Sequence, residues 1–173
     1  MEKRTTAKRK NLQQLRLRRS FNPRQLDWLM ESTSLTERMS QESKKDFSVK
    51  RLPTYPAHSL PKVLRRQVIL CYKGRPWVYA ESTLRRAELG WRQHYLNLLG
   101  NRSIGTLVIQ KYRLKKTLFR VEPVVSGSAL MRRLQLATGA SEPQLWSRYA
   151  EYQWGRHVLE VKEVFLPASK MLG

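Results

Sequence analysis

Cysteine and histidine are scarce in this sequence, and neither occurs in a pattern that builds a metal or redox centre. Cys71 is the one cysteine, so no intramolecular disulfide can form. None of the histidines His58, His94 and His157 stands at a metal-ligand spacing from another histidine, a cysteine or a carboxylate. Glycine-rich phosphate loops and a G-x-S-x-G nucleophile turn are also missing. We therefore expect no metal, no bound cofactor and no covalent nucleophile.

Long hydrophobic runs are missing as well. No stretch approaches the roughly 18–20 apolar residues of a membrane span, and the N-terminus lacks the apolar centre of a secretory signal. With 173 residues, 40% of them hydrophobic, the chain can bury the core of one domain. Residues 1–20 are polar and basic, so we expect a flexible tail there and one domain over 21–173. These features predict a cytoplasmic protein, and we expect a monomer.

Acidic residues are few, with 13 Asp and Glu against 34 Lys and Arg, which gives a net charge of +21. The first 19 residues contribute +7 of this, and the rest of the chain carries +14. Charge of this sign attracts anions such as nucleic acid, a membrane surface or a small dicarboxylate, and it makes their capture sensitive to salt. A solvated basic surface with no ligand is equally consistent with the composition.

Periodicity and turn residues predict a mixed fold. Helices are expected after the caps Asn22-Pro23 and Ser34, the latter with Glu37 three residues on, and over 87–99 and 128–137. Strands are expected at 47–49, at 117–125 and in two hairpins, 66–72 with 75–81 around Lys73-Gly74 and 145–152 with 157–166 around Trp154-Gly155. Long hairpins with helices between them indicate an α+β domain with an antiparallel sheet.

The last expected strand contains a carboxylate among apolar side chains. Because side chains alternate along a strand, Glu163 shares a face with Leu159, Val161 and Phe165. A buried carboxylate must be paired, hydrogen-bonded or protonated. Glu163 therefore either forms a structural pair with an arginine, on a face that can be partly exposed, or lines a ligand pocket.

An arginine poses the same question in the first hairpin. Arg66 shares a face with Val68 and Leu70, whereas the adjacent Arg65 points to the other face. Spacing alone does not say which of the two arginines is inside the protein.

Several segments together resemble the chorismate pyruvate-lyase family, over roughly residues 24–170. The most specific is the closing E-V-F-L-P-A-S at 163–169, and the others occur in the family's order at 26–29, 34–38, 66–71, 74–77 and 99–105. The resemblance implies one antiparallel sheet with helices packed on one side, a fold that the ligand-sensing domains of GntR-type regulators share. It also implies that Arg66 binds a ring carboxylate, that Glu163 holds a ring hydroxyl, and that Leu35 and Ile104 touch the ligand from two lid segments.

The function implied by this resemblance is a cofactor-independent lyase that converts chorismate to 4-hydroxybenzoate and pyruvate, the first step toward ubiquinone. Arg66 and Glu163 are then the catalytic residues. Two alternatives stay open. The same fold can serve as a ligand-sensing module without catalysis. The net charge and the aromatic residues among basic ones, such as Tyr112, Phe119 and Tyr149, also fit a nucleic-acid-binding protein, although no specific motif supports it.

Overall fold

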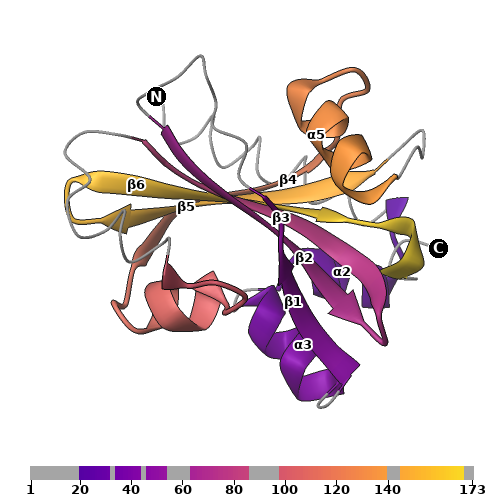
Figure 1. The fold of residues 1–173 in the computed structure, drawn as a ribbon, viewed down its shortest axis with the longest axis horizontal. Coiled ribbons are helices and arrows are strands. Elements are labelled where there is room, and N and C mark those ends of the chain that lie inside the picture. Colours follow the sequence, from indigo (N-terminus) through magenta and orange to yellow (C-terminus); the bar gives the residue numbers. More distant parts are fainter. Residues whose placement is uncertain are drawn as a thin grey trace.

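A six-stranded sheet forms the framework of the protein, in the strand order β1-β2-β3-β6-β5-β4 (Figure 1). The computed structural model describes residues 20–31, 34–43, 46–53, 63–85, 98–139 and 145–169. The strands are β1 (Phe47–Arg51), β2 (Val63–Tyr72), β3 (Arg75–Arg85), β4 (Lys115–Pro123), β5 (Trp146–Trp154) and β6 (His157–Phe165). All neighbouring strands pair antiparallel, which confirms the expected α+β class with a single antiparallel sheet.

Two of the predicted segments fall mostly outside the described residues. Of the tail expected over 1–20, only Ser20 is described. Of the helix expected over 87–99, only the last two residues are described.

Two tight turns set the long hairpins. Lys73 and Gly74 join β2 to β3 with φ angles of 49° and 73°, the left-handed pair that a two-residue hairpin turn requires. The turn between β5 and β6 is made by Gly155 and Arg156, because Trp154 still belongs to β5. The second turn therefore lies one residue later than predicted.

Three of the expected helices are present, and the structure adds two short helices that were not predicted. The expected helices are α2 (Pro23–Leu29), α3 (Leu35–Ser43) and α5 (Ala129–Thr138), and the added ones are the π-helix η2 (Gly105–Gln110) and the short 3-10 helix η3 (Pro167–Ser169). Asn22 and Gln25 cap each other's backbone at the start of α2, and the Ser34 hydroxyl accepts from the first turn of α3. Ser128 caps α5, and Gly139 ends it at φ 70°. Among the described residues, no helix is long and apolar enough to cross a membrane.

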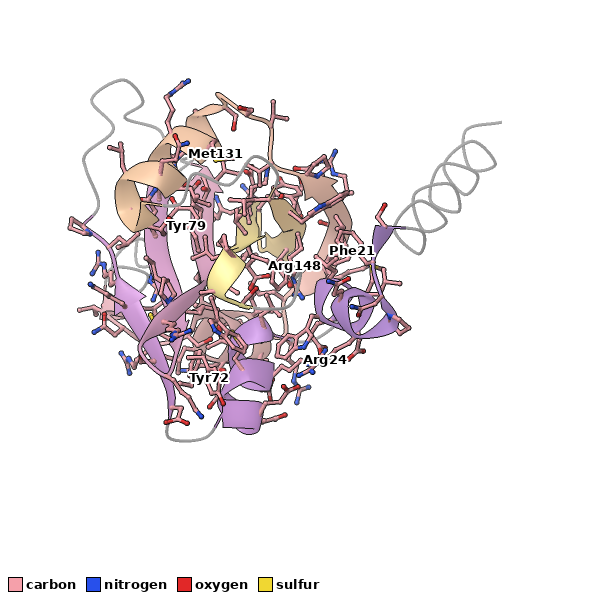
Figure 2. The ribbon with its side chains drawn as sticks, turned by 90° about the vertical axis from the view of Figure 1, so that its right-hand side faces the viewer. Phe21, Arg24, Tyr72, Tyr79, Met131 and Arg148 are labelled. Carbon is pink, nitrogen blue, oxygen red and sulfur yellow. The ribbon has the colours of Figure 1, made fainter. Side chains whose placement is uncertain are left out.

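The helices occupy both faces of the sheet, which corrects the expectation that they pack on one side. In Figure 1, α5 lies on one side of the sheet and α3 lies on the other. Trp28 and Leu29 of α2 pack in the same cluster as Leu35 of α3. Figure 2 shows Tyr79 of β3 close to Met131 of α5, while Arg148 of β5 lies toward α2. The reason is that the central strands are apolar on both faces, since Tyr79 and Val164 form a buried cluster with Met131 and Leu134. A second apolar face needs its own helix to cover it.

The face under α2, α3 and η2 holds two apolar clusters with charged groups between them. Trp28, Leu29 and Leu35 belong to the cluster beneath α2 and α3. Val108 and Leu159 belong to the cluster beneath η2. Residues that lie opposite each other on neighbouring strands form rows across the sheet. Two adjacent rows between these clusters contain polar residues, one with Arg66 and Ser82 and the other with Arg148 and Glu163. Polar side chains placed within a core in this way suggest a site for a ligand.

Candidate active site

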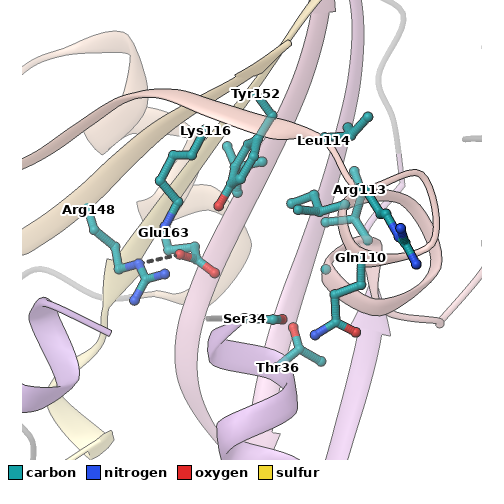
Figure 3. Close-up of a pocket in the computed structure, with 13 residues that line it drawn as sticks. Ser34, Thr36, Gln110, Arg113, Leu114, Lys116, Arg148, Tyr152 and Glu163 are labelled. Carbon is teal, nitrogen blue, oxygen red and sulfur yellow. Dashed lines mark ion pairs between the residues drawn. The ribbon is translucent and has the colours of Figure 1, made fainter. Parts of the chain in front are cut away.

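A cavity of about 510 Å³ lies on this face, bounded by η2, the start of α3 and strands β4 to β6. This volume falls in the range of small-molecule sites, about 300–1,000 Å³. Its apolar walls include Ile104, Ile109, Leu114 and Val161, and its polar side chains include Lys116, Arg148, Tyr152 and Glu163. Figure 3 shows the last four side chains pointing into the same space. An apolar cavity with a few convergent charged groups suits a small anionic ligand.

Glu163 lies on the wall of this cavity and is paired with Arg148. The two residues stand directly opposite each other in the register of β5 and β6. Nε of Arg148 lies 2.7 Å from Oε2 of Glu163, and their side chains are 3% and 13% exposed. Arg148 also approaches the carbonyl of Trp28, with Nη1 at 3.5 Å. The carboxylate thus has an arginine partner and also lines a cavity, so the structural pair does not exclude a role in ligand binding.

Arg66 lies on the same sheet face, in the adjacent row of the sheet. It is opposite Ser82 of β3, which is in turn opposite Val161 of β6, two residues from Glu163. The guanidinium is buried, with 4% of the residue exposed. Nη2 donates to the carbonyls of Gly100 at 3.0 Å and Arg102 at 2.6 Å. Arg66 therefore also holds the segment that leads to Ile104 at the cavity wall.

Arg66 carries a buried charge that the described residues do not neutralise by an ion pair. Its buried Nε has no hydrogen-bond partner among them. Burial, with a smaller contribution from the positive charge of Arg51, lowers the pKa of Arg66 to about 10. The group thus stays cationic at neutral pH in a place where a cation needs an anion. Arg65, by contrast, faces α5 and lies 3.8 Å from Glu81, so the structure identifies Arg66 as the arginine on the cavity side.

Of the two residues predicted to touch the ligand from lid segments, Ile104 lines the cavity and Leu35 does not. Leu35 is fully buried in the core beneath α3, and its neighbours Ser34 and Thr36 are the ones that line the cavity. The backbone of Gly105 packs so closely on Ser34 that a Cβ there would overlap its side chain. The structure thus brings Glu163 and Ile104 into one cavity and places Arg66 and Leu35 just beside it.

Lys116 and Tyr152 line the cavity but were not among the predicted site residues. Tyr152 lies four residues after Arg148 in β5. Because side chains alternate along a strand, this even spacing would have placed Tyr152 on the same face as Arg148. Lys116 gave no such signal, because an irregularity between Lys116 and Leu118 breaks the alternation of β4. Burial, and then the charge of Glu163, raise the pKa of Tyr152 to about 12, so its hydroxyl stays protonated at neutral pH.

The fold of this chain is shared with a solved structure of low sequence identity. PhnF from Mycobacterium smegmatis superposes with a TM-score of 0.51 at 13% sequence identity, over 81% of this chain and 66% of that one. This likeness concerns the fold alone.

The sequence comparison is more specific. Residues 8–172 match the family model described as chorismate lyase, and the chain belongs to that family. A probable chorismate pyruvate-lyase of Shewanella loihica is 29% identical over 154 residues, covering 84% of this chain and 81% of the relative. A probable chorismate pyruvate-lyase of Dechloromonas aromatica is 31% identical over 156 residues, covering 84% of this chain and 88% of the relative.

Proposed function

We propose that the protein is a lyase that converts chorismate to 4-hydroxybenzoate and pyruvate without a cofactor, as the first step toward ubiquinone. The observation that carries this proposal is the buried cation of Arg66 on the same sheet face as the cavity carboxylate, Glu163. A ligand that brings its own carboxylate would neutralise Arg66, and membership of the chorismate lyase family indicates which ligand that is.

The spacing of the two groups suits a six-membered ring. Arg66 and Glu163 are on β2 and β6, with β3 between them, so their strands lie about 10 Å apart. Their long side chains reduce that separation. Chorismate carries its ring carboxylate and its ring hydroxyl at opposite ends of the ring. Arg66 binds the first, through donors other than the Nη2 group engaged with the backbone, and Glu163 accepts a hydrogen bond from the second.

The chemistry asks little of the protein beyond positioning. The ether bond between the ring and the enolpyruvyl group breaks, and its electron pair leaves with the enolpyruvyl oxygen. The ring carbon that bears the hydroxyl loses its hydrogen as a proton, which makes the ring aromatic. Protonation of the enolpyruvate methylene gives pyruvate, so no atom is gained or lost. Aromatisation supplies the driving force, and a dry pocket holds the reactive conformer.

The test is to incubate the purified protein with chorismate and to measure 4-hydroxybenzoate by absorbance and pyruvate by a coupled assay. Equal amounts of the two products are expected. Glu163→Gln should lower kcat/KM, whereas Glu160→Gln, on the opposite face of the same strand, should not. Tight binding of chorismate with no turnover would instead identify a ligand-sensing module of this fold.

A further inference from the structure

The described lining of the cavity carries more positive charge than the Arg148–Glu163 pair accounts for. Arg113, Lys116 and Arg148 contribute three cations, against the single carboxylate of Glu163. Arg148 is 2.7 Å from Glu163, so those two charges largely cancel. A cavity left with net positive charge suits an anion, and Arg66 beside it supplies a further cation for a second one.

Lys116 is a second cation, besides Arg148, on the Glu163 side of this cavity. In Figure 3 its side chain lies between those of Arg148 and Tyr152 and points toward Glu163. Its Nζ is 5.2 Å from the ring of Phe119 and 5.7 Å from the ring of Tyr152. Lys116 is half-buried, whereas Arg113 is exposed.

Burial and the neighbouring charge of Arg148 act on the ammonium in the same direction. Both lower the pKa of Lys116, and the carboxylates of Glu163 and Glu31 only partly offset them. An additional anion beside Lys116 would stabilise its charged form, so this is a favourable place for a carboxylate.

The connectivity of the substrate links this cation to one chemical group. In chorismate, the carbon that bears the hydroxyl is bonded to the carbon that bears the enolpyruvyl ether. With the ring carboxylate at Arg66 and the hydroxyl at Glu163, the enolpyruvyl carboxylate therefore lies on the Glu163 side of the cavity. We propose that Lys116 binds this second carboxylate, so that its loss weakens the binding of the dianionic substrate more than that of the monoanionic product. This inference rests on the proposed function.

The test compares two ligands on matched variants of the full chain. In Lys116→Met, we expect the KM for chorismate to rise about 10-fold or more, because a charge-assisted hydrogen bond is lost. The Kd for 4-hydroxybenzoate, which lacks that carboxylate, should change less than about twofold. Lys116→Arg keeps the charge and should recover most of the chorismate affinity. Lys115→Met removes an exposed charge of the same strand and should alter neither constant.

The outcomes separate this inference from the lyase assignment. If wild-type protein turns over chorismate but Lys116→Met changes both constants equally, or neither, Lys116 has no selective role and the lyase assignment stands. If wild-type protein binds chorismate without turnover and Lys116→Met weakens that binding alone, the lyase assignment fails and the carboxylate site stands.

A binding measurement on wild-type protein tests the same inference without relying on the folding of any variant. 4-Hydroxybenzene-1,3-dicarboxylate adds a carboxylate next to the hydroxyl of the product. It should bind more tightly than 4-hydroxybenzoate, and equal or weaker binding would contradict the role of Lys116.

Discussion

The guanidinium of Arg148 lies 2.7 Å from the carboxylate of Glu163, directly across the β5–β6 register and on the wall of the cavity. A bond from a side chain on a central strand fixes the carboxylate better than a loop residue could. Arg148 is therefore a positioning residue for Glu163, in addition to neutralising its charge.

Arg148→Met should lower kcat/KM by about 10- to 100-fold, because the Glu163 carboxylate loses its fixed orientation. It should also destabilise the fold by about 3–5 kcal/mol, since it leaves a buried charge without its partner. Urea unfolding measures the second effect. The double variant Arg148→Met/Glu163→Met should recover part of that stability while staying inactive. A double variant less stable than Arg148→Met would show that the pair is not the source of the loss.

Replacing the two adjacent arginines of β2 should affect ligand binding to very different extents. Arg66→Ala should raise the Kd for 4-hydroxybenzoate by about 30-fold or more, because the ring carboxylate loses a buried cationic partner. Arg65→Ala should change it by less than about threefold, since Arg65 faces α5. Calorimetric titration measures both values. Equal losses in the two variants would place the carboxylate site elsewhere.

Much of this site could be predicted from the sequence, because alternation along a strand is a local property. The alternation predicted that Glu163 lies among apolar side chains and that Arg66 shares a face with Val68. In the structure, both residues lie on the cavity side of the sheet. Capping residues likewise fixed the start of α2 and the end of α5. These features depend on neighbours within a few residues.

Features that depend on distant parts of the chain could not be predicted in this way. The choice between Arg65 and Arg66 is settled by α5, which covers one face and brings Arg133 to Glu81. Arg148 was visible in the sequence, but its pairing with Glu163 follows from the register of β5 and β6. The position of Lys116 depends on a local irregularity in β4 that no alternation pattern reveals.

Glu81 should make stability depend on pH without affecting catalysis. Burial alone would raise its pKa, but hydrogen bonds from Arg133, Tyr79 and Gln67 outweigh burial and lower the pKa below 4.5. A carboxyl group with a lowered pKa in the folded state stabilises the fold above about pH 4.5, and this contribution is lost as the pH falls through the lowered pKa.

The variant Glu81→Gln isolates this contribution. Its unfolding free energy should fall furthest below that of wild-type protein at neutral pH, and the gap should narrow as the pH drops below about 4.5. Urea titrations between pH 3 and pH 7 would measure the gap. A gap that widens toward low pH would contradict the sign of the pKa shift. Turnover at pH 7 should persist, because Glu81 lies on the face covered by α5.

The basic N-terminal segment should be dispensable for the chemistry. Residues 1–19 carry +7 of the net charge, and the cavity lining that the structure describes is supplied by residues between Ser34 and Glu163. A protein that begins at Ser20 should therefore keep kcat within about twofold of the full chain. A folded but inactive truncation, with unchanged circular dichroism, would show that the segment contributes to the site.

The remaining charge should act on the capture of substrate. Removing residues 1–19 still leaves +14 on the chain, and a field of that sign attracts a dianion. We expect kcat/KM for chorismate to fall as sodium chloride rises from about 10 mM to 500 mM, because the Debye length shortens from about 30 Å to a few Å. The value of kcat should change little, since the bound ligand is shielded from solvent ions. The truncated protein should show a shallower slope, and a slope equal to that of the full chain would mean that the N-terminal charges do not attract the substrate.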